Sequence, residues 1–241
     1  MFTDEFLAAQ RLLVITPHAD DETYGCAGTI ARVKSLGGTV HVVLVSVANL
    51  VHYGATAGGE HALVTHSTRL DEFGRVMKYL DVDDWECLFT DEETHLALDA
   101  VPRKKLVGLL ESTGRLSIDR LRPTMVMIPA VSYNQDHEAL FHACITATRP
   151  GGGSKHTVPF VLAYDSTSLC WPVGTRFQPD VYVDVSEFLE TKIEALRMHA
   201  SQVRDPLFHG SPEGLELQTL ARGREVGVAA AEGFRLLRGV F

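Results

Sequence analysis

Four side chains that can bind a metal ion or move a proton stand within five positions of the sequence. His18, Asp20, Asp21 and Glu22 occur in the segment PHADDE, directly after the apolar run LLVIT. Carboxylates this close repel one another and are costly to desolvate, so a cation or a proton must offset their charge. Imidazole nitrogen and carboxylate oxygen together suit zinc, or another first-row divalent ion. The alternative interpretation is that Asp20 or Asp21 only caps the helix that follows.

A second segment can complete such a metal site. A catalytic zinc ion usually takes three protein ligands and leaves one position open. PHADDE offers two plausible ligands, so we expect the third from the end of another strand. The run TMVMIP leads into AVSYNQDH, where Asp136 and His137 both fit that need. His142 lies one residue beyond a full helical repeat from His137 and is less well placed to share the site.

The elements that must position these residues alternate along the chain. Short β-branched runs predict strands at 12–16, 40–47, 86–89, 124–129, 160–164 and 181–185. Apolar periodicity and capping signals predict helices at 23–36, 62–80, 101–115, 135–148, 186–200 and 213–233, with a loop over 48–60. This alternation indicates an α/β domain with a parallel sheet covered by helices on both faces. Ligands bind beyond the carboxyl ends of the strands in such sheets.

Composition excludes several classes of protein. The chain has 241 residues, 45% of them hydrophobic, and 31 acidic against 22 basic residues give a net charge of −9. This balance argues against a nucleic-acid partner or an anionic membrane partner. No apolar run reaches the roughly 18 residues of a membrane span, and the acidic start MFTDEFLAAQ does not resemble a secretory signal. The four cysteines lie far apart with no CxxC pair, which favours reduced thiols and a cytoplasmic protein.

Three segments carry a resemblance to a known family. PHADDE after a strand, NQDH after a later strand and the tail ARGREVGVAAAEGF resemble the LmbE-like, or PIG-L, family of zinc-dependent N-acetyl sugar deacetylases. The typical motifs of that family are AHPDDE and either HxDH or NxDH. The helix GCAGTIAR and the segment RLDE at 69–72 fit as well, so the resemblance covers nearly the whole chain as a single domain, 1–241. It implies a Rossmann-like three-layer α/β sandwich with a mostly parallel central sheet.

The resemblance also implies roles for individual residues. His18, Asp21 and His137 would bind Zn²⁺, with Fe²⁺ or another divalent ion as an alternative, and Asp20 would be the general base. Asn134 stands where some members carry a histidine that stabilises the oxyanion or protonates the amine, so the general acid stays unassigned. Ala19 replaces the usual proline of the first motif.

The chemistry of amide hydrolysis suggests further contacts. The tetrahedral intermediate needs a donor besides zinc, and Asn134 and Tyr133 are the candidates. Glu22 would hold the helix start or support a ligand, and Asp136 would orient His18 or His137 through a ring N–H.

Other candidates each have a plainer alternative. The resemblance suggests that Arg69 and Asp91 contact the sugar; the alternatives are a surface ion pair of Arg69 with Asp71 or Glu72, and a turn aspartate. Tyr164 and Trp171 could stack on a sugar, although core packing is commoner for such residues. His199 and His209 are candidate general acids, but a surface position is the simpler expectation for both.

We therefore expect a zinc-dependent hydrolase that removes an N-acetyl group from an amino sugar or a small glycoconjugate. One alternative is an amidase that cleaves a larger acyl group or a thiol-conjugate amide. Another is a non-catalytic sugar-binding relative, an interpretation that rests on Asn134 alone. The expected partner is a small N-acetylated molecule, with neither nucleic acid nor membrane, and the oligomeric state is left open, a homo-oligomer included.

Overall fold

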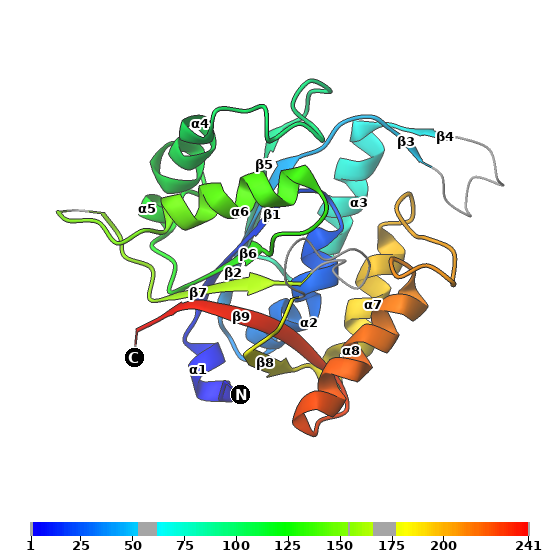
Figure 1. Ribbon diagram of the computed structural model, residues 1–241. Helices are drawn as coiled ribbons and strands as arrows, with labels where there is room; N and C mark the ends of the chain where they lie inside the picture. The colour runs from blue at the N-terminus through cyan, green and yellow to red at the C-terminus, as the bar shows by residue number, and fades with distance from the viewer. Residues whose placement is uncertain (1, 53–61, 154, 166–176, 241) are drawn as a thin grey trace.

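A twisted sheet forms the centre of the protein. The computed structural model describes residues 2–52, 62–153, 155–165 and 177–240. Within these ranges it contains a seven-stranded sheet of order β5-β2-β1-β6-β7-β9-β8 (Figure 1). Its strands are β1 (Arg11–Thr16), β2 (Thr39–Ser46), β5 (Asp84–Phe89), β6 (Met125–Pro129), β7 (Phe160–Tyr164), β8 (Val181–Asp184) and β9 (Ala231–Gly239).

Most of this sheet is parallel, as predicted. The neighbouring pairs from β5 to β7 are all parallel, whereas β9 runs antiparallel to both β7 and β8. Strands such as β2, TVHVVLVS, read as continuous apolar runs because a central parallel strand is covered on both faces. The carboxyl ends of β1, β2, β5 and β6 therefore meet at one edge of the sheet.

Helices cover both faces, which confirms the predicted α/β sandwich (Figure 1). Leu12 and Val14 of β1 pack into one core with α2 (Asp21–Ser35), α3 (His66–Tyr79) and α7 (Leu189–Met198). The alternate residues Leu13 and Ile15 pack into the opposite core with α4 (Arg103–Gly108), α5 (Ile118–Leu121) and α6 (Gln135–Ala147). The remaining helices are α1 (Asp4–Ala8) and α8 (Pro212–Val226). This alternation follows from the two-residue repeat of a strand.

The expected helix over 62–80 is wrong at its start. Ala62–Val64 forms strand β4, which pairs antiparallel with β3 (Leu50–His52), a strand within the segment expected to be a loop. Helix α3 begins only at His66, because the Thr65 side chain accepts a hydrogen bond from the Thr68 backbone nitrogen and caps it. The rest of the predicted loop, 53–61, lies outside the described residues.

The expected helix over 213–233 is wrong at its end. Helix α8 ends at Val226, where Gly227 takes a left-handed φ of 77°. Glycine adopts that conformation without steric cost and stops the helix. The following residues form β9, which lies between β7 and β8. Two shorter differences are a π-helical turn at Leu109–Thr113 and a 3₁₀ turn at Ser186–Phe188, both inside predicted helices.

A buried ion pair fixes the position of α2, whose first turn begins within PHADDE at Asp21. Lys192 on α7 contacts Glu232 on β9 at 2.5 Å and donates to the carbonyl oxygen of Tyr24 at 2.7 Å. Glu232 in turn accepts from the backbone nitrogens of Gly28 and Thr29 at 2.9 and 2.8 Å. Both charged groups are thus paired and hydrogen-bonded, as buried charges must be. The network ties α2, α7 and β9 together.

No helix in the described part of the chain is long and apolar enough to cross a bilayer. Cys26, Cys87 and Cys144 are free thiols, and Cys170 lies outside the described residues.

Candidate metal centre and its cavity

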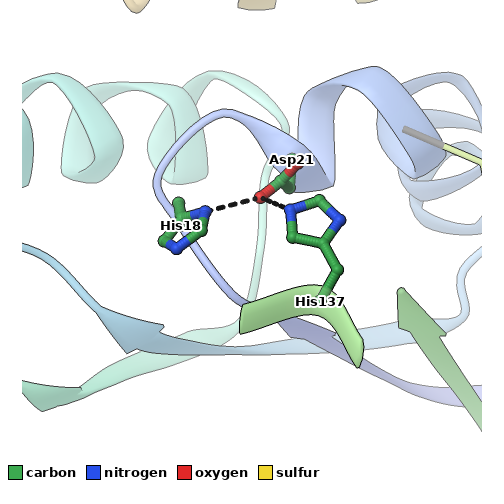
Figure 2. Close-up of side chains that lie close together, drawn as sticks. All are labelled: His18, Asp21 and His137. Atoms are coloured by element: carbon green, nitrogen blue, oxygen red, sulfur yellow. Dashed lines mark ion pairs between the residues drawn. The ribbon is translucent and has the colours of Figure 1, made fainter. Parts of the chain in front are cut away.

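The two predicted motifs meet where the sheet changes its direction of growth. β2 lies on one side of β1 and β6 on the other, so the loops after β1 and β6 diverge and leave a crevice between them. His18 lies in the loop after β1, Asp21 is the first residue of α2, and His137 lies in the first turn of α6 (Figure 2). All three side chains are buried.

One carboxylate oxygen lies between the two imidazole rings. Asp21 Oδ2 is 3.3 Å from His18 Nδ1 and 3.2 Å from His137 Nε2 (Figure 2). One ligand atom from each of the three residues lies within 4.8 Å of the others, so the cluster could hold a metal ion. The buried Asp21 Oδ2 has no hydrogen-bond partner among the described residues. Such an atom is costly unless a cation satisfies it, so the residues fit a metal ion.

Asp136 sets the orientation of His18. Its Oδ2 lies 2.8 Å from His18 Nε2, and its Oδ1 accepts a hydrogen bond from the Leu98 backbone nitrogen at 2.9 Å. A carboxylate only accepts, so His18 Nε2 carries the proton. The lone pair of Nδ1 then points to Asp21 Oδ2, which makes a metal ion or a second proton necessary between them.

The titration of both groups reflects this crowding. Burial alone would lower the pKa of His18, but the hydrogen bond to Asp136 and the negative charge of Asp21 beside the ring outweigh it and raise that pKa to about 9. Burial would raise the pKa of Asp21, but His137 and His18 outweigh it and lower that pKa. A proton on His18 thus offsets the negative charge of Asp21 in the metal-free chain, as a bound divalent cation would.

Asp20 stands beside this cluster in a strained conformation. Its φ is 130°, which L-residues rarely adopt. It occupies the N-cap position of α2, yet its side chain makes no capping hydrogen bond, so the capping interpretation does not apply to it. Burial, with the charge of Asp21 beside it, raises the pKa of Asp20 to about 7.

Glu22 and His199 hold that strained residue. Glu22 Oε2 accepts from the Asp20 backbone nitrogen at 3.1 Å, and Glu22 Oε1 lies 2.8 Å from His199 Nε2. His199 is fully buried, so the expected surface position is wrong; it follows α7 and packs beside Phe73 of α3. Burial would lower the pKa of His199, but Glu22 outweighs it and raises that pKa.

Asn134 is the N-cap of α6. Its Oδ1 accepts from the Asp136 backbone nitrogen at 2.9 Å, which leaves the side-chain NH₂ as its donor toward the cavity. Tyr133 beside it also lines the cavity and is 46% exposed.

Arg69 and His95 form a buried pair next to the His-Asp-His cluster of His18, Asp21 and His137. Arg69 Nη1 donates to His95 Nε2 at 2.9 Å, so the proton of the neutral ring is on Nδ1, which lies 3.1 Å from Ser46 Oγ. Burial and the charges of His18 and Arg69 lower the pKa of His95 to about 3, which keeps it neutral. The alternative surface pair of Arg69 does not fit, since Arg69 is buried and Glu72 binds Ser201.

His95 was not among the predicted site residues, although a signal for it exists. It follows β5, and the carboxyl end of β5 lies at the same sheet edge as those of β1 and β6. Its ring centroid lies 5.2 Å from that of His18. Inspection of the residues after every predicted parallel strand would have included it.

The other sequence candidates take different positions. Asp91 is exposed and accepts from the Thr94 backbone nitrogen at 2.9 Å, as a turn aspartate does, and it does not line the cavity. Tyr164 is a core residue whose hydroxyl donates to the Ile15 carbonyl oxygen at 3.0 Å. His209 lines the cavity, and Trp171 lies outside the described residues.

A single cavity of about 440 Å³ gathers these groups. That volume lies within the usual range of small-molecule sites. We call seven of its polar lining residues the floor: His18, Asp20, Asp21, Arg69, His95, Asn134 and His137. A mostly parallel α/β sandwich with a His-Asp-His cluster in such a cavity defines a Rossmann-like protein with the donor set of a metal-dependent hydrolase.

The chain belongs to the PIG-L family, described as GlcNAc-PI de-N-acetylase, whose model matches residues 13–148. That match includes both motifs and every residue of the metal cluster. The predicted family is thereby confirmed.

Similar proteins extend the comparison over the rest of the chain. The diacetylchitobiose deacetylase of Thermococcus kodakarensis is 27% identical over 99% of this chain and 87% of its own length. A probable N-acetyl-alpha-D-glucosaminyl L-malate deacetylase of Bacillus subtilis is 26% identical over 82% of this chain and 86% of its own. The 4-carboxy-2-hydroxymuconate hydratase GalB of Pseudomonas putida has the same fold, with a TM-score of 0.69 at 20% identity over 95% of this chain and 97% of its own. At that identity the likeness concerns the fold alone.

Proposed function

We propose that this protein is a zinc-dependent hydrolase that removes an N-acetyl group from an amino sugar or a small glycoconjugate. The observation that carries the proposal is the Asp21 oxygen, buried without a hydrogen bond between His18 and His137. Membership of a de-N-acetylase family and the similarity to a sugar deacetylase support the proposal that the hydrolysed bond is an N-acetyl amide bond.

His18, Asp21 and His137 would hold the zinc ion through two nitrogens and one oxygen, a donor set that zinc prefers. Bound zinc would acidify a water molecule and polarise the acyl carbonyl. Asp136 keeps His18 Nδ1 unprotonated toward the ion. The second nitrogen of His18 faces Asp136, which fixes the orientation of this ligand.

Asp20 would act as the general base, since it is adjacent to a ligand and its pKa of about 7 suits proton transfer near neutral pH. It takes a proton from water while the water oxygen bonds to the acyl carbon. The C–N bond then breaks, acetate leaves, and the amine nitrogen receives the proton that Asp20 held. Asp20 alone thus balances the reaction, so Asn134 at the usual histidine position does not prevent turnover.

Three further groups would contact the substrate. The Asn134 NH₂ would donate to the acyl oxygen as negative charge develops there, with Tyr133 as a second donor. Arg69 would donate to sugar oxygens, because its Nε is buried without a partner among the described residues and it lines the cavity.

A screen with the zinc-reconstituted protein tests the proposal. The substrates are N-acetylated amino sugars together with matched sugars that carry longer acyl groups or thiol-conjugate amides, and the readouts are free amine and released acid. We expect equal amounts of amine and acetate from at least one N-acetyl sugar. Amine from the longer acyl amides alone would identify an amidase, and binding of the sugars without any amine would identify a sugar-binding relative.

We also propose that the enzyme works in the cytoplasm on a small diffusible substrate. The described thiols are free, and the net charge of −9 disfavours polyanionic partners.

A further inference from the structure

Exposed apolar side chains gather at the mouth of the metal-site cavity. Val51, Leu96, Tyr133 and Phe208 line the cavity, and each is at least two-fifths exposed: 44%, 40%, 46% and 58%. Two more exposed residues extend this group. Leu63 pairs directly with Val51 across the β3–β4 hairpin, and Leu207 precedes Phe208. We call these six residues the apolar rim. Exposed apolar groups that cluster in this way mark a binding surface.

The apolar rim is assembled from separate parts of the chain. The β3–β4 hairpin, the segment after β5, the loop between β6 and α6 and the segment before α8 each contribute to it. The cavity floor below carries imidazole, carboxylate and guanidinium groups. The cavity therefore has a polar end suited to a sugar amide and an apolar end suited to a different chemical group.

Leu96 reaches the rim at an energetic cost. Its φ of 60° is left-handed, which costs a leucine about 1 kcal/mol or more. The Gln135 side chain donates to the Leu96 carbonyl oxygen at 2.7 Å and holds this backbone in place. Asparagine or glycine would take this conformation more easily, so leucine here places an apolar side chain at the mouth against backbone preference.

The position of the apolar rim indicates which molecule binds there. Val51, Leu96, Tyr133 and Phe208 are walls of the cavity that contains the His-Asp-His cluster, so a molecule with its amide on the floor must pass along them as it leaves. A second protein chain seated on the rim would close that entrance. Arg204 and Asp205 line the same cavity as Phe208, and their opposite charges favour neither an anion nor a cation.

We propose that the apolar rim binds an alkyl or aryl aglycone of the amino-sugar substrate. This proposal rests on the proposed deacetylase function and adds the substrate class to it. The sugar amide lies on the polar floor, and the aglycone loses water against Val51, Leu96 and Phe208. Burial of roughly two methylene groups there would raise affinity about tenfold.

Paired glycosides test the proposal on the zinc-loaded full chain. Octyl and methyl glycosides of N-acetylglucosamine carry the same amide and differ only in the aglycone. Calorimetry gives the dissociation constant of each, with the octyl glycoside kept below its micelle concentration, and acetate release gives kcat/KM. We expect the octyl glycoside to bind about tenfold tighter than the methyl glycoside, with a similar gain in kcat/KM.

Two substitutions locate the effect. Val51→Thr keeps the β-branched shape of a strand residue, and Leu96→Asn suits a left-handed backbone, so both remove apolar surface with little strain. Together they should reduce the octyl preference to about threefold or less. Leu217→Ser is the matched control, because Leu217 is 69% exposed on α8 and does not line the cavity. It should leave the tenfold preference unchanged.

The outcomes separate the proposals. Equal affinity for the two glycosides, or a preference that the rim substitutions leave intact, overturns the rim proposal. A tenfold octyl preference in binding without acetate release supports the rim and rejects the deacetylase function. If light scattering shows that the rim substitutions dissociate an oligomer while the octyl preference persists, the rim is an interface between copies of this chain, and the proposal is wrong.

Discussion

The Asp136 carboxylate lies 2.8 Å from His18 Nε2 and thereby leaves His18 Nδ1 facing Asp21. Asp136 is the residue immediately before His137. The first turn of α6 therefore supplies both His137, a member of the His-Asp-His cluster, and the carboxylate that orients His18. Carboxylates that hold a metal-ligating histidine in this way commonly raise the affinity for the metal.

Asp136→Asn tests this relationship. The asparagine oxygen can still accept from the Leu98 backbone nitrogen, but its NH₂ would face His18 Nε2. His18 would then carry its proton on Nδ1, where the ion must bind. We predict that zinc affinity falls about 10- to 100-fold in a chelator competition assay while the fold is retained. An unchanged affinity would show that Asp136 does not set the tautomer.

The variant Asp20→Asn tests whether Asp20 acts as the general base rather than as a metal ligand. The amide cannot accept the proton of water, so we predict that kcat falls about 10²- to 10⁴-fold while the zinc content is retained. Asp71→Asn is the control, because Asp71 is exposed on α3, and its activity should equal that of the wild type. Full activity of Asp20→Asn would reject Asp20 as the base.

His95 is expected to act on the substrate through Arg69. His95→Phe removes the acceptor of the Arg69 hydrogen bond, so the guanidinium loses its fixed direction. We predict that KM rises about tenfold with a smaller change in kcat, because the bond to a charged donor is worth about 1.5 kcal/mol. His95→Gln offers an amide oxygen and should restore part of the loss. A purely structural role would instead give the same KM in both variants as in the wild type.

The buried pair of His199 and Glu22 predicts a pH dependence of stability. The pKa of His199 is raised above 6.5 in the folded chain, so the folded state binds its proton more tightly than the unfolded state. Its contribution is therefore complete below pH 6.5 and is lost as pH rises through the folded pKa. We predict that the free energy of unfolding falls less steeply from about pH 6 to about pH 9 in His199→Gln than in the wild type. Urea titrations of both proteins measure the slopes, and identical slopes would contradict the raised pKa.

The meeting of the two motifs was predictable because each directly follows a buried strand of a parallel sheet. The residues at the carboxyl ends of such strands lie at the same edge of the sheet, whatever the conformation of the loops that follow. What the sequence does not reveal is that β6 lies next to β1, which depends on long-range pairing. The distances between His18, Asp21 and His137 follow from that adjacency.

The errors have a common physical origin. The segment of β9, AEGFRLLRG, has apolar residues at spacings that fit a helix as well as a strand, and only its place between β7 and β8 selects the strand. His199 looked like a surface residue because histidine is polar. Its burial depends on Glu22, a partner 177 residues away in sequence. Local patterns carry no information about such partners.

The central claim is that His18, Asp21 and His137 bind one metal ion, and elemental analysis after zinc loading and dialysis tests it most directly. We predict one zinc per chain in the wild type and in His142→Ala, whose side chain is 44% exposed on the same helix as His137. His137→Ala and Asp21→Ala should retain less than about a tenth of that zinc. A full complement of zinc in either of these two variants would contradict the account.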